Sequence, residues 1–534
     1  MTKIIKWQLL LSALLLSVLF GKQAQGATYT AASCSESDVA NAVAQATNGD
    51  TVIIPACSST TPGGTNTWTT SLTITVGITL QGQGIGNTVL IDNVSKGNSS
   101  CGAASPMLTM SPGTNNFRIT GFTLQGDAPD TYVCQPGHIV LTGTGSASRV
   151  DHISFSNQQT VGIRTSGCIY GVIDHNTFQG TFKQGVMVWH DGCGGDSYGD
   201  YNWNAATQLG TANFIFIETN TFTDPSAVGA GAMDNFGGSR VVFRYNTASF
   251  IVGHGTESTG RVRGMRAFEI YNNTFTAIEA SQFAAFYVRS GTGVIHDNQF
   301  NDSGSFTYGA TINVINDRDS DAFSPWGTPA GSGHPGACDG TGPYDGNAGT
   351  VYASGTYNGT SGVSNVMTDS TKSFTTNQWV GSYAIRNVTE GWGAIIASNT
   401  SNTITNASSA YGQSRNWNSG DSYQVLSAYP CTDQVGRGVG VLLSGATPTP
   451  TSSVSEALEP VYQWNNTHNG VSGSVTISSQ SMRIVANRDY YDNTPMPGYT
   501  PYVYPHPLVS GTPPPPPPTG PAAPSGLAAV VHSN

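Results

Sequence analysis

The chain has 534 residues, of which 38% are hydrophobic and only 10% are charged, and its formal net charge is −11. This length can bury a large core in roughly one to three domains, whereas the acidic balance and the lack of a Lys/Arg-rich tail argue against a nucleic-acid-binding protein. The 65 glycines, with many Asn, Ser and Thr residues, favour an extracellular all-β protein over a helical bundle.

The first 26 residues have the order of a secretory signal peptide. Lys3 and Lys6 precede an apolar run over residues 9–20, and small residues follow as far as Gly26. This run is too short for a typical membrane span. We therefore expect cleavage after residue 26 and a secreted product without a membrane span; an uncleaved anchor is the alternative.

The next segments predict the beginning of a stacked β structure. Residues 38–46 fit a short amphipathic helix that ends before Asn48-Gly49, and residues 51–55 fit a strand. Residues 78–82 and 88–91 would add the first coils. The helix would cap the open apolar end of a solenoid, where strand edges are otherwise unpaired.

Short β-branched segments that end in Asn-x-Phe, or a near variant, repeat through the middle of the chain. Their asparagines are separated by 44, 26, 27 and 25 residues: Asn176, Asn220, Asn246, Asn273 and Asn298. The first step is about two coils, or one coil plus a loop over residues 192–210. Short strands at this period predict a parallel β-helix, in which stacked Asn side chains can hydrogen-bond along the column.

This order of helix, strands and coils resembles right-handed parallel β-helix proteins of the pectate-lyase-like superfamily, over about residues 30–320 and again over 436–510. The expected fold is therefore an all-β, right-handed parallel β-helix over residues 27–345, whose last coils and C-terminal wrap occupy residues 431–510.

An inserted small β module is expected between these parts, at residues 346–430. Its Trp379, Trp392 and Trp417 could offer sugar-stacking faces, although we favour a small internal core. We expect residues 511–534 to form a Pro-rich linker, and residues 521–527 resemble the first strand of a fibronectin type III domain, which would be truncated here.

Eight cysteines in an exported chain are typical of disulfides, and none of the pairs has the spacing of a zinc knuckle. We expect sequential pairing, while other connectivities stay open. The predicted pairs are Cys34–Cys57, Cys101–Cys134, Cys168–Cys193 and Cys338–Cys431, the last of which would join the ends of the insertion.

Arginines are concentrated in one part of the chain. Seven of the 15 lie between residues 240 and 318: Arg240, Arg244, Arg261, Arg263, Arg266, Arg289 and Arg318. Guanidinium groups bind carboxylates with two hydrogen bonds, so the cluster indicates an anion-binding groove. The alternative is that these arginines lie on solvated coil faces, where they pair with Asp and Glu.

Part of the cluster resembles a motif of pectate lyases. Residues 261–266 are similar to the Arg-x-Pro-x-x-Arg stretch of that family, although Arg263 replaces the proline, and residues 172–178 resemble an upstream strand of the family without its Trp. The resemblance implies that Arg261 abstracts the proton α to a uronate carboxylate and that Arg266 binds the substrate. We expect further substrate contacts from Arg263, Arg289, Arg244 and His190.

Pectate lyases use calcium to neutralise the carboxylate, and the resemblance therefore suggests Ca²⁺ as a cofactor. Asp191, Asp196 and Asp200, in the loop after Trp189, could offer the oxygen ligands that this ion prefers.

A second constellation comes from aligning the coils, which places Asp191, Asp234, His254 and Arg289 at similar positions in successive turns, about 4.8 Å apart. The surrounding residues resemble polygalacturonase motifs, in which paired acids protonate the glycosidic oxygen and activate water. Asn235 stands where that family has a second Asp, and no Lys follows Arg289. Asp234 and His254 could equally serve as catalytic residues of a lyase.

We therefore expect a secreted, monomeric lyase that cleaves an anionic, uronic-acid-containing polysaccharide by β-elimination. A glycoside hydrolase using Asp191 and Asp234 is the alternative within the same fold. A non-catalytic glycan-binding or adhesin protein is the alternative from another class, favoured by the inserted module and the polyproline tail. The neighbouring pairs Asp151-His152 and Asp174-His175 are interpreted as structural hydrogen-bond pairs at a strand edge.

Overall fold

The structure is a computed structural model. It describes residues 26–97, 101, 103–127, 134–158, 160–180, 184–223, 231–255, 262–315, 350–381, 383–406, 415–427, 433–440, 443–444, 449–450, 456–481 and 483–510. Residues 1–25 of the predicted signal peptide and the Pro-rich tail from residue 511 lie outside these residues. Within the described part, no helix is long and apolar enough to cross a membrane.

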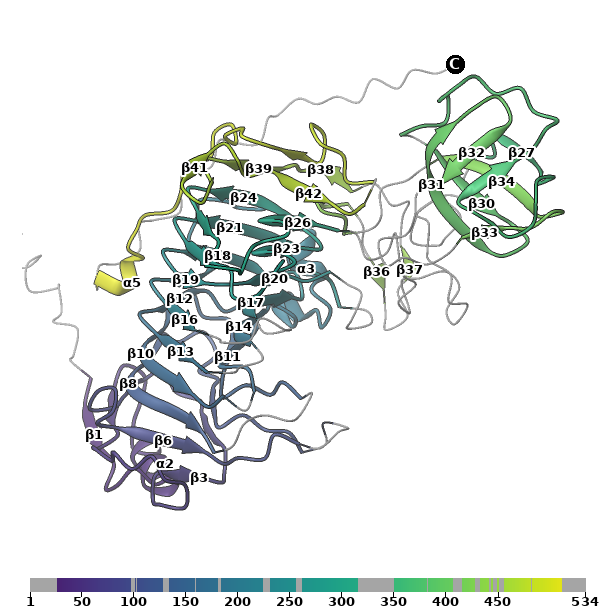
Figure 1. Cartoon of the computed structure of the whole chain (residues 1–534). Helices are drawn as coiled ribbons and strands as arrows, with labels where there is room; N and C mark the ends of the chain where they lie inside the picture. Colours follow the sequence, from purple (N-terminus) through teal and green to yellow (C-terminus); the bar gives the residue numbers. More distant parts are fainter. Residues whose placement is uncertain are drawn as a thin grey trace, which may run out of the picture.

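Two large parallel sheets dominate the molecule, and the predicted all-β parallel β-helix is confirmed (Figure 1). The larger sheet has 21 strands. In the N-terminal coils these are β1 (Thr28–Thr30), β2 (Thr51–Ile53), β3 (Thr67–Trp68), β5 (Thr79–Gln81), β6 (Val89–Asp92), β8 (Phe117–Gly126) and β10 (Ser148–Ser156). They continue as β12 (Gly171–Asp174), β13 (Thr177–Gln179), β15 (Ile215–Glu218), β16 (Thr221–Thr223), β18 (Arg240–Arg244), β19 (Thr247–Ala248), β21 (Ala267–Tyr271), β22 (Thr274–Thr276), β24 (Thr292–His296), β25 (Gln299–Asn301), β39 (Val461–Trp464), β40 (Thr467–His468), β41 (Val471–Ser472) and β43 (Tyr490–Tyr491).

The second sheet has ten strands, one from each coil, and its outer face carries the site described below. Its strands are β4 (Leu72–Ile74), β7 (Leu108–Met110), β9 (Ile139–Gly143), β11 (Ile163–Gly167), β14 (Gln184–Trp189), β17 (Gly231–Phe236), β20 (Ile251–Gly253), β23 (Phe286–Val288), β26 (Ile312–Val314) and β42 (Ile477–Ser479).

The repeated asparagines form the predicted hydrogen-bonded column at the corner of the larger sheet. Asn220 donates from Nδ2 to Oδ1 of Asn246 (3.1 Å), and Asn246 donates in the same way to Asn273 (3.2 Å). Each Oδ1 also accepts the backbone N–H of the preceding Asn in the column, as Asn246 does from Asn220 (2.8 Å). Because these groups are buried, the column holds successive coils in register.

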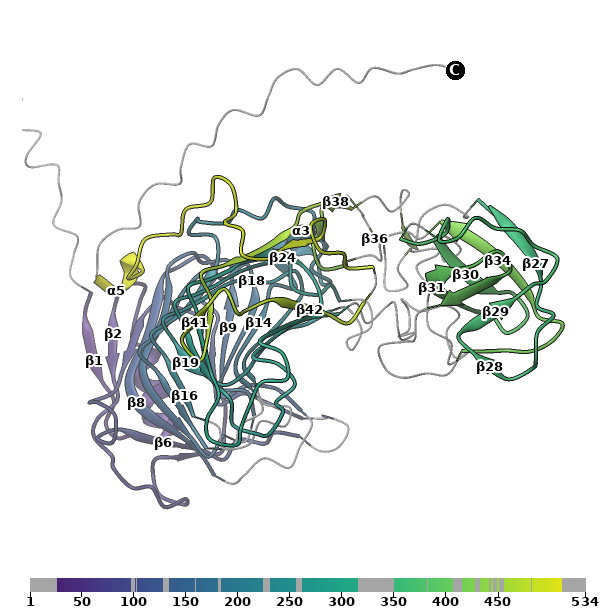
Figure 2. The ribbon, with the colours of Figure 1, turned by 45° about the horizontal axis from the view of Figure 1, so that its top comes forward.

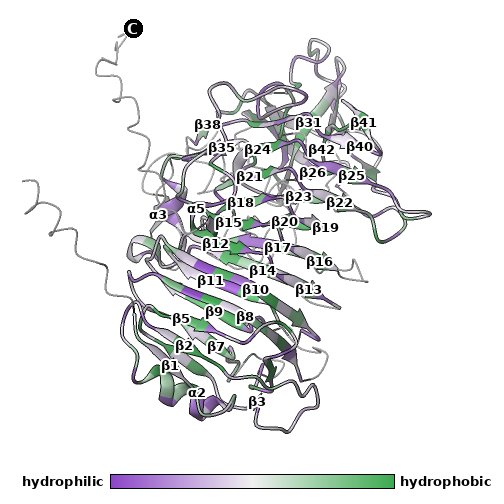
Figure 3. Ribbon diagram, turned by 90° about the vertical axis from the view of Figure 1, so that its left-hand side faces the viewer, coloured by the Kyte–Doolittle hydropathy of each residue, from purple (hydrophilic) through white to green (hydrophobic). Residues whose placement is uncertain are grey.

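Apolar side chains alternate with polar ones along the strands, so that one side of each sheet faces the interior. Figure 3 shows this alternation in β8 and β10. Inside the solenoid, Phe155, Phe178 and Phe222 stack in successive coils with ring centroids 4.6 Å apart at each step. The interior therefore repeats the same contact from coil to coil.

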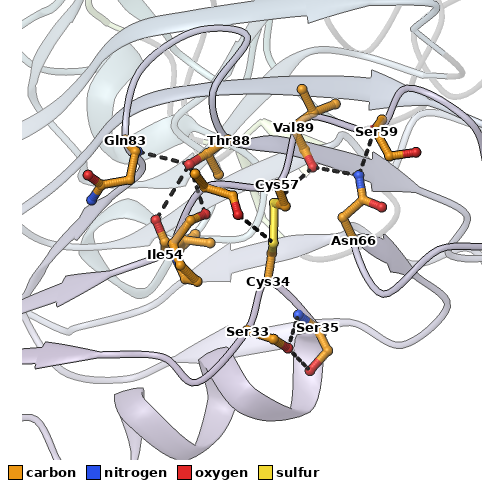
Figure 4. The surroundings of a disulfide bond; sticks show 12 residues. Ser33, Cys34, Ser35, Ile54, Cys57, Ser59, Asn66, Gln83, Thr88 and Val89 are labelled. Atoms are coloured by element: carbon orange, nitrogen blue, oxygen red, sulfur yellow. Dashed lines mark hydrogen bonds between the residues drawn. A yellow bond between two sulfur atoms is a disulfide. The ribbon is translucent and has the colours of Figure 1, made fainter.

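The N-terminal end is capped by helix α2 (Glu36–Val43), which begins two residues before the predicted helix and ends earlier. The Ser35 hydroxyl accepts the Asp38 N–H at its first turn, and Val39 and Ala42 pack on the solenoid core. The Cys34–Cys57 disulfide joins this cap to the first coils (Figure 4). Pairing is also confirmed for Cys101–Cys134 and Cys168–Cys193, whereas Cys338 and Cys431 lie outside the described residues.

An antiparallel β module lies between β26 and β39 in the sequence (Figure 1). Its Trp379, Trp392 and Trp417 are buried in its own hydrophobic core, which confirms the favoured interpretation of these tryptophans. Strand β39 pairs directly with β24, so the solenoid resumes as if the module were absent. The module strands are β27 (Ala353–Thr356), β28 (Val363–Ser364), β29 (Val366–Thr368), β30 (Tyr383–Asn387), β31 (Trp392–Asn399), β32 (Thr403–Asn406), β33 (Asn416–Trp417) and β34 (Ser422–Ser427).

Short elements complete the described chain. They are η1 (Cys193–Gly195), α3 (Asp200–Trp203), β35 (Arg437–Gly438), β36 (Leu443–Ser444), β37 (Thr449–Pro450), β38 (Ala457–Leu458) and α5 (Pro507–Ser510).

The C-terminal segment, residues 499–510, returns along the outside of the larger sheet and ends in α5 (Figure 2). It was expected to wrap the last coils, but it reaches much further back. The Tyr499 hydroxyl donates to Glu269 on β21, the His506 N–H donates to Glu218 on β15, and the Leu508 carbonyl accepts from Arg149 on β10. This segment therefore covers the outer face of the middle coils.

Candidate functional site

A pocket of about 480 Å³ opens on the outer face of the ten-stranded sheet, over β17, β20 and β23. Its lining includes Asp234, His254, Arg289 and Glu279, which gives it two carboxylates, an imidazole and a guanidinium. A concave site with a few convergent polar groups is the usual form of a ligand-binding site.

The strand register explains why three of these residues meet. Gly253 on β20 pairs with Val288 on β23, so the residues that follow them, His254 and Arg289, are neighbours on adjacent coils. Met233 on β17 pairs with Ile251 on β20, so Asp234 lies two positions before His254 in the register. On its other side, Asp234 pairs with Met187 on β14. Side chains at alternate positions of a strand share a face, so Asp234, His254 and Arg289 all point outward.

Asp234 and His254 approach each other directly. The Nε2 atom of His254 lies 3.8 Å from Oδ2 of Asp234, and their side chains are only 15% and 5% exposed. Asp234 also accepts the Asn235 N–H on Oδ1 (2.8 Å) and the Gln184 Nε2–H on Oδ2 (3.3 Å). The His254 ring stacks on Phe236, with ring centroids 4.0 Å apart. Both side chains are therefore held in place before any ligand arrives.

An aromatic wall borders the charged groups. The Arg289 guanidinium lies over the Tyr287 ring, 4.6 Å from its centroid, and Phe283 contacts Tyr287 edge to face. Phe283 is exposed, and Phe250 packs beside it. The pocket thus combines an apolar surface with groups that donate and accept hydrogen bonds, as a sugar ring requires.

Asp191 does not belong to this pocket, contrary to the alignment of the coils by sequence. Its backbone continues four residues beyond Met187, the partner of Asp234, into the turn before η1. There its carboxylate accepts a hydrogen bond from the Ser166 hydroxyl (3.3 Å). Burial raises the pKa of Asp191, while the nearby Arg164 opposes that shift.

Four arginines of the dense cluster are internal rather than displayed in a groove: Arg240, Arg244, Arg263 and Arg266. Arg244 pairs with Glu218 and donates to the Tyr271 hydroxyl (2.8 Å), and it is 0% exposed. Its two other acceptors are the carbonyls of Tyr502 and Val503 in the C-terminal segment. Protein groups thus surround the Arg244 guanidinium, and the expected role of Arg244 in substrate binding stays a prediction.

Arg263 and Arg266 have similar surroundings. Arg263 pairs with Asp200 (2.7 Å) and Asp433, and Arg266 pairs with Glu459 (2.7 Å) and donates to a backbone carbonyl. Both are 0% exposed. Both arginines pair with acids, as in the alternative interpretation, but they are buried and do not lie on solvated coil faces. Arg261 lies outside the described residues, as does Arg318, so the predicted role of Arg261 stays a prediction.

His190 is also buried, and it binds backbone rather than ligand. Its Nε2–H donates to the Ile169 carbonyl (3.1 Å), and Nδ1 accepts the Arg240 N–H (3.3 Å). Burial, assisted by the charge of Arg240, lowers the pKa of His190 to about 3. A neutral, enclosed imidazole does not provide a contact for an anionic substrate.

The three acids proposed for calcium do not form one ligand set. Asp196 accepts the backbone N–H groups of Tyr198 and Tyr201, Asp200 pairs with Arg263, and Asp191 contacts Ser166. Among the described residues, no group of three His, Cys, Asp or Glu side chains is arranged to hold a metal ion. The residues of this loop thus do not fit the predicted calcium site.

Several lining residues escaped the sequence interpretation. Tyr287 could have been found, since it lies two residues before Arg289 and must share its face. The segment after β22 is irregular, so strand alternation does not predict which of its side chains point into the pocket. Three of them do: Glu279, Gln282 and Phe283.

No protein-family model, no curated protein and no solved structure matches the chain.

Proposed function

We propose that this chain is a secreted polysaccharide lyase that acts on a uronic-acid-containing polymer at the pocket around Asp234, His254 and Arg289. The observation that carries the proposal is the meeting of an acid, an imidazole and a guanidinium in one pocket on the outer face of a β-helix. The three disulfides support an extracellular location. The β-helix itself supports the resemblance to the pectate-lyase-like superfamily.

The chemistry assigns one role to each residue. Arg289 pairs with the carboxylate of the uronate, which acidifies the C5 proton next to it. His254 accepts that proton, and Asp234 stabilises the charge that the imidazole then carries. The C4–oxygen bond breaks as the C4–C5 double bond forms, and the imidazolium returns its proton to the departing oxygen. Atoms and charges balance without a further reactant.

This assignment keeps the predicted β-elimination but changes the predicted base. In this scheme His254 acts as the base, the role that the resemblance to pectate lyases gave to Arg261. No step depends on calcium, because Arg289 neutralises the substrate carboxylate in this scheme. The aromatic wall of Tyr287, Phe283 and Phe250 would hold the sugar ring.

A glycoside hydrolase is the second candidate, and one specific observation favours it. Asp234 and Glu279 line the same pocket, and two carboxylates across a glycosidic bond can act as acid and base. Glu279 would then replace Asp191 of the sequence-based hypothesis.

The first experiment incubates the purified protein with pectate, alginate and other polyuronates and follows two products. Ultraviolet absorbance reports the unsaturated end that β-elimination creates, and a reducing-end assay reports both reactions. Absorbance with new reducing ends supports the lyase, whereas reducing ends alone support the hydrolase. The absence of both products from a folded sample would refute both enzymes and favour a glycan-binding protein.

Variants then assign the roles. His254→Ala should lower kcat on the polyuronate about 10²–10⁴-fold, the usual contribution of a general base. His468→Ala is the matched control, since His468 also pairs through Nε2 with an acid, Asp302 at 3.1 Å, but on the other sheet. Equal activity of the two variants would remove His254 from the mechanism. Glu279→Gln should lower activity severely only if the enzyme is a hydrolase.

A further inference from the structure

A second hollow, of about 530 Å³, lies on the first coils of the larger sheet, away from the pocket around Asp234. It is lined by Gln81, Gln83, Arg118 and His152, with glycines between them. Nothing in the proposed reaction uses these residues.

This hollow forms where two glycines stand at a corner position that is occupied by imidazole side chains in the two coils that follow. The register places Gly82, Gly121, His152 and His175 at one corner position of successive coils. His152 and His175 stack in parallel, with centroids 5.2 Å apart and an interplanar angle of 1°. The column of rings stops at Gly121, which leaves the other face of the His152 ring open to the hollow.

The backbone requires glycine at Gly82, whereas Gly121 has the left-handed conformation that His152 and His175 also adopt in the same column. A Cβ on Gly82 would lie 2.4 Å from the Gly121 carbonyl oxygen, and Gly121 has a φ of +78°. The ring of His152 is fixed as well, because Nδ1 lies 2.6 Å from the buried carboxylate of Asp151. A ligand ring bound on the open face of His152 could therefore continue the stack. It would occupy the place of a side-chain ring in the preceding coil, because coils repeat at about 4.8 Å.

Polar groups surround that position. Arg118 donates to Asp151 through Nε and Nη2 (2.7 and 2.6 Å), and within the described residues its Nη1 makes no hydrogen bond. The amides of Gln81 and Gln83 are exposed, and each can both donate and accept. Figure 4 shows the Gln83 side chain directed away from the Cys34–Cys57 disulfide.

The C-terminal segment leaves this hollow accessible. Arg149, the strand partner of Arg118, is covered because it donates to the Leu508 carbonyl, and its side chain is 11% exposed. The Arg118 side chain, one coil further toward the N-terminus, is 40% exposed. The C-terminal segment thus covers Arg149 but ends before Arg118, whose side chain stays accessible to a ligand.

We propose that this hollow is a second, non-catalytic binding site for a pyranose ring of the acidic polysaccharide, stacked on His152 and bound by Arg118 and Gln83. The amides match sugar hydroxyls, the imidazole face matches the apolar face of the ring, and Arg118 matches a carboxylate. The identity of the polymer rests on the proposed function; the existence of the site does not.

The test measures binding without turnover. The full chain carrying His254→Ala is run by affinity electrophoresis in gels that contain pectate, alginate or neutral galactan. Adding His152→Ala should weaken retardation by an acidic polymer about tenfold or more, whereas His152→Phe, which keeps a ring at the same position, should retain most of it. His468→Ala serves as the control, and thermal unfolding must show that every variant is folded.

The outcomes separate this proposal from the lyase. Equal retardation of the His152→Ala and parent chains, or retardation by galactan alone, would overturn the second site whatever the enzyme assay gives. Loss of retardation in His152→Ala but not in the control supports the site even if no cleavage is ever observed. With the active chain, His152→Ala should raise KM for the long polymer and leave kcat on a short oligomer unchanged.

Discussion

Replacing Arg244 by Met distinguishes an internal ion pair from a substrate-binding arginine. The substitution keeps much of the apolar stem but removes the partner of Glu218, which is 1% exposed. It also deprives the Tyr271 hydroxyl and the Tyr502 and Val503 carbonyls of a donor. Because a buried charge is left uncompensated, we expect a loss of about 3–5 kcal/mol in the free energy of unfolding.

The loss should depend on pH in a defined direction. Burial already raises the pKa of Glu218, and Arg244 opposes that shift, so removing Arg244 raises this pKa further. Protonation of Glu218 then relieves the uncompensated charge, and the destabilisation should shrink as the pH falls through its folded-state pKa. Denaturant unfolding at several pH values measures this, and limited proteolysis reports release of residues 499–510.

The control is Arg488→Met, because the Arg488 side chain is 41% exposed and the buried carboxylate of its partner Asp489 keeps a second cationic partner, Arg437. That variant should lose much less stability than Arg244→Met, because no buried carboxylate is left without a partner. The reasoning fails if Arg244→Met unfolds like the parent protein but binds polyuronate more weakly. Such a result would restore the role in substrate binding that the sequence suggested.

Three further predictions concern the metal, the asparagine column and a buried acid. A chelator should leave polyuronate cleavage unchanged, since Asp191, Asp196 and Asp200 are not assembled around one ion; a loss of activity that calcium restores would contradict this. Asn246→Ala should lower the free energy of unfolding by about 2–5 kcal/mol, measured by denaturant titration, because the Asn220 N–H and the Ile217 carbonyl lose buried partners; an unchanged midpoint would show that the column can be replaced. Burial raises the pKa of Glu269 from 4.5 to about 7, so the folded protein holds a proton on this carboxyl that the unfolded chain releases. The free energy of unfolding should therefore fall as the pH rises from about 4.5 to 7. Glu269→Gln should remove this part of the pH dependence of the unfolding midpoint.

The fold could be predicted because its constraints repeat. Each coil must return an asparagine to the same corner, so the spacing of Asn220, Asn246 and Asn273 records the geometry directly. The cysteines that pair lie in neighbouring coils, and sequential pairing follows from that proximity.

The arginines could not be placed by the same reasoning. Strand alternation predicts that Arg240 and Arg244 share the outer face of β18, but not what covers that face. The covering groups come from elsewhere: Arg240 donates to the Thr207 carbonyl, and Arg244 to carbonyls more than 250 residues away. A local count of charges therefore cannot distinguish a binding groove from an internal network.

Coil alignment failed at Asp191 because the coils differ in length. The partners Met187 and Asp234 are separated by the long excursion through η1 and α3, whereas Met233 and Ile251 lie 18 residues apart. A residue count therefore misplaces side chains after any loop. His254 and Arg289 were matched correctly because both directly follow paired strands.

Coverage of the outer faces explains which charged residues remain available for a ligand. On the larger sheet the C-terminal segment turns Arg149 and Arg244 into structural groups, whereas Arg118 keeps 40% of its side chain exposed. On the ten-stranded sheet, Asp234, His254 and Arg289 line a pocket that remains open. If covering is the deciding factor, deleting residues 499–510 should expose Arg244 and add a second polyanion-binding site on the larger sheet, besides the one proposed at Arg118, without changing the pocket. Binding that appears in the deletion variant and disappears in its Arg244→Met derivative would establish this, and an unchanged affinity would refute it.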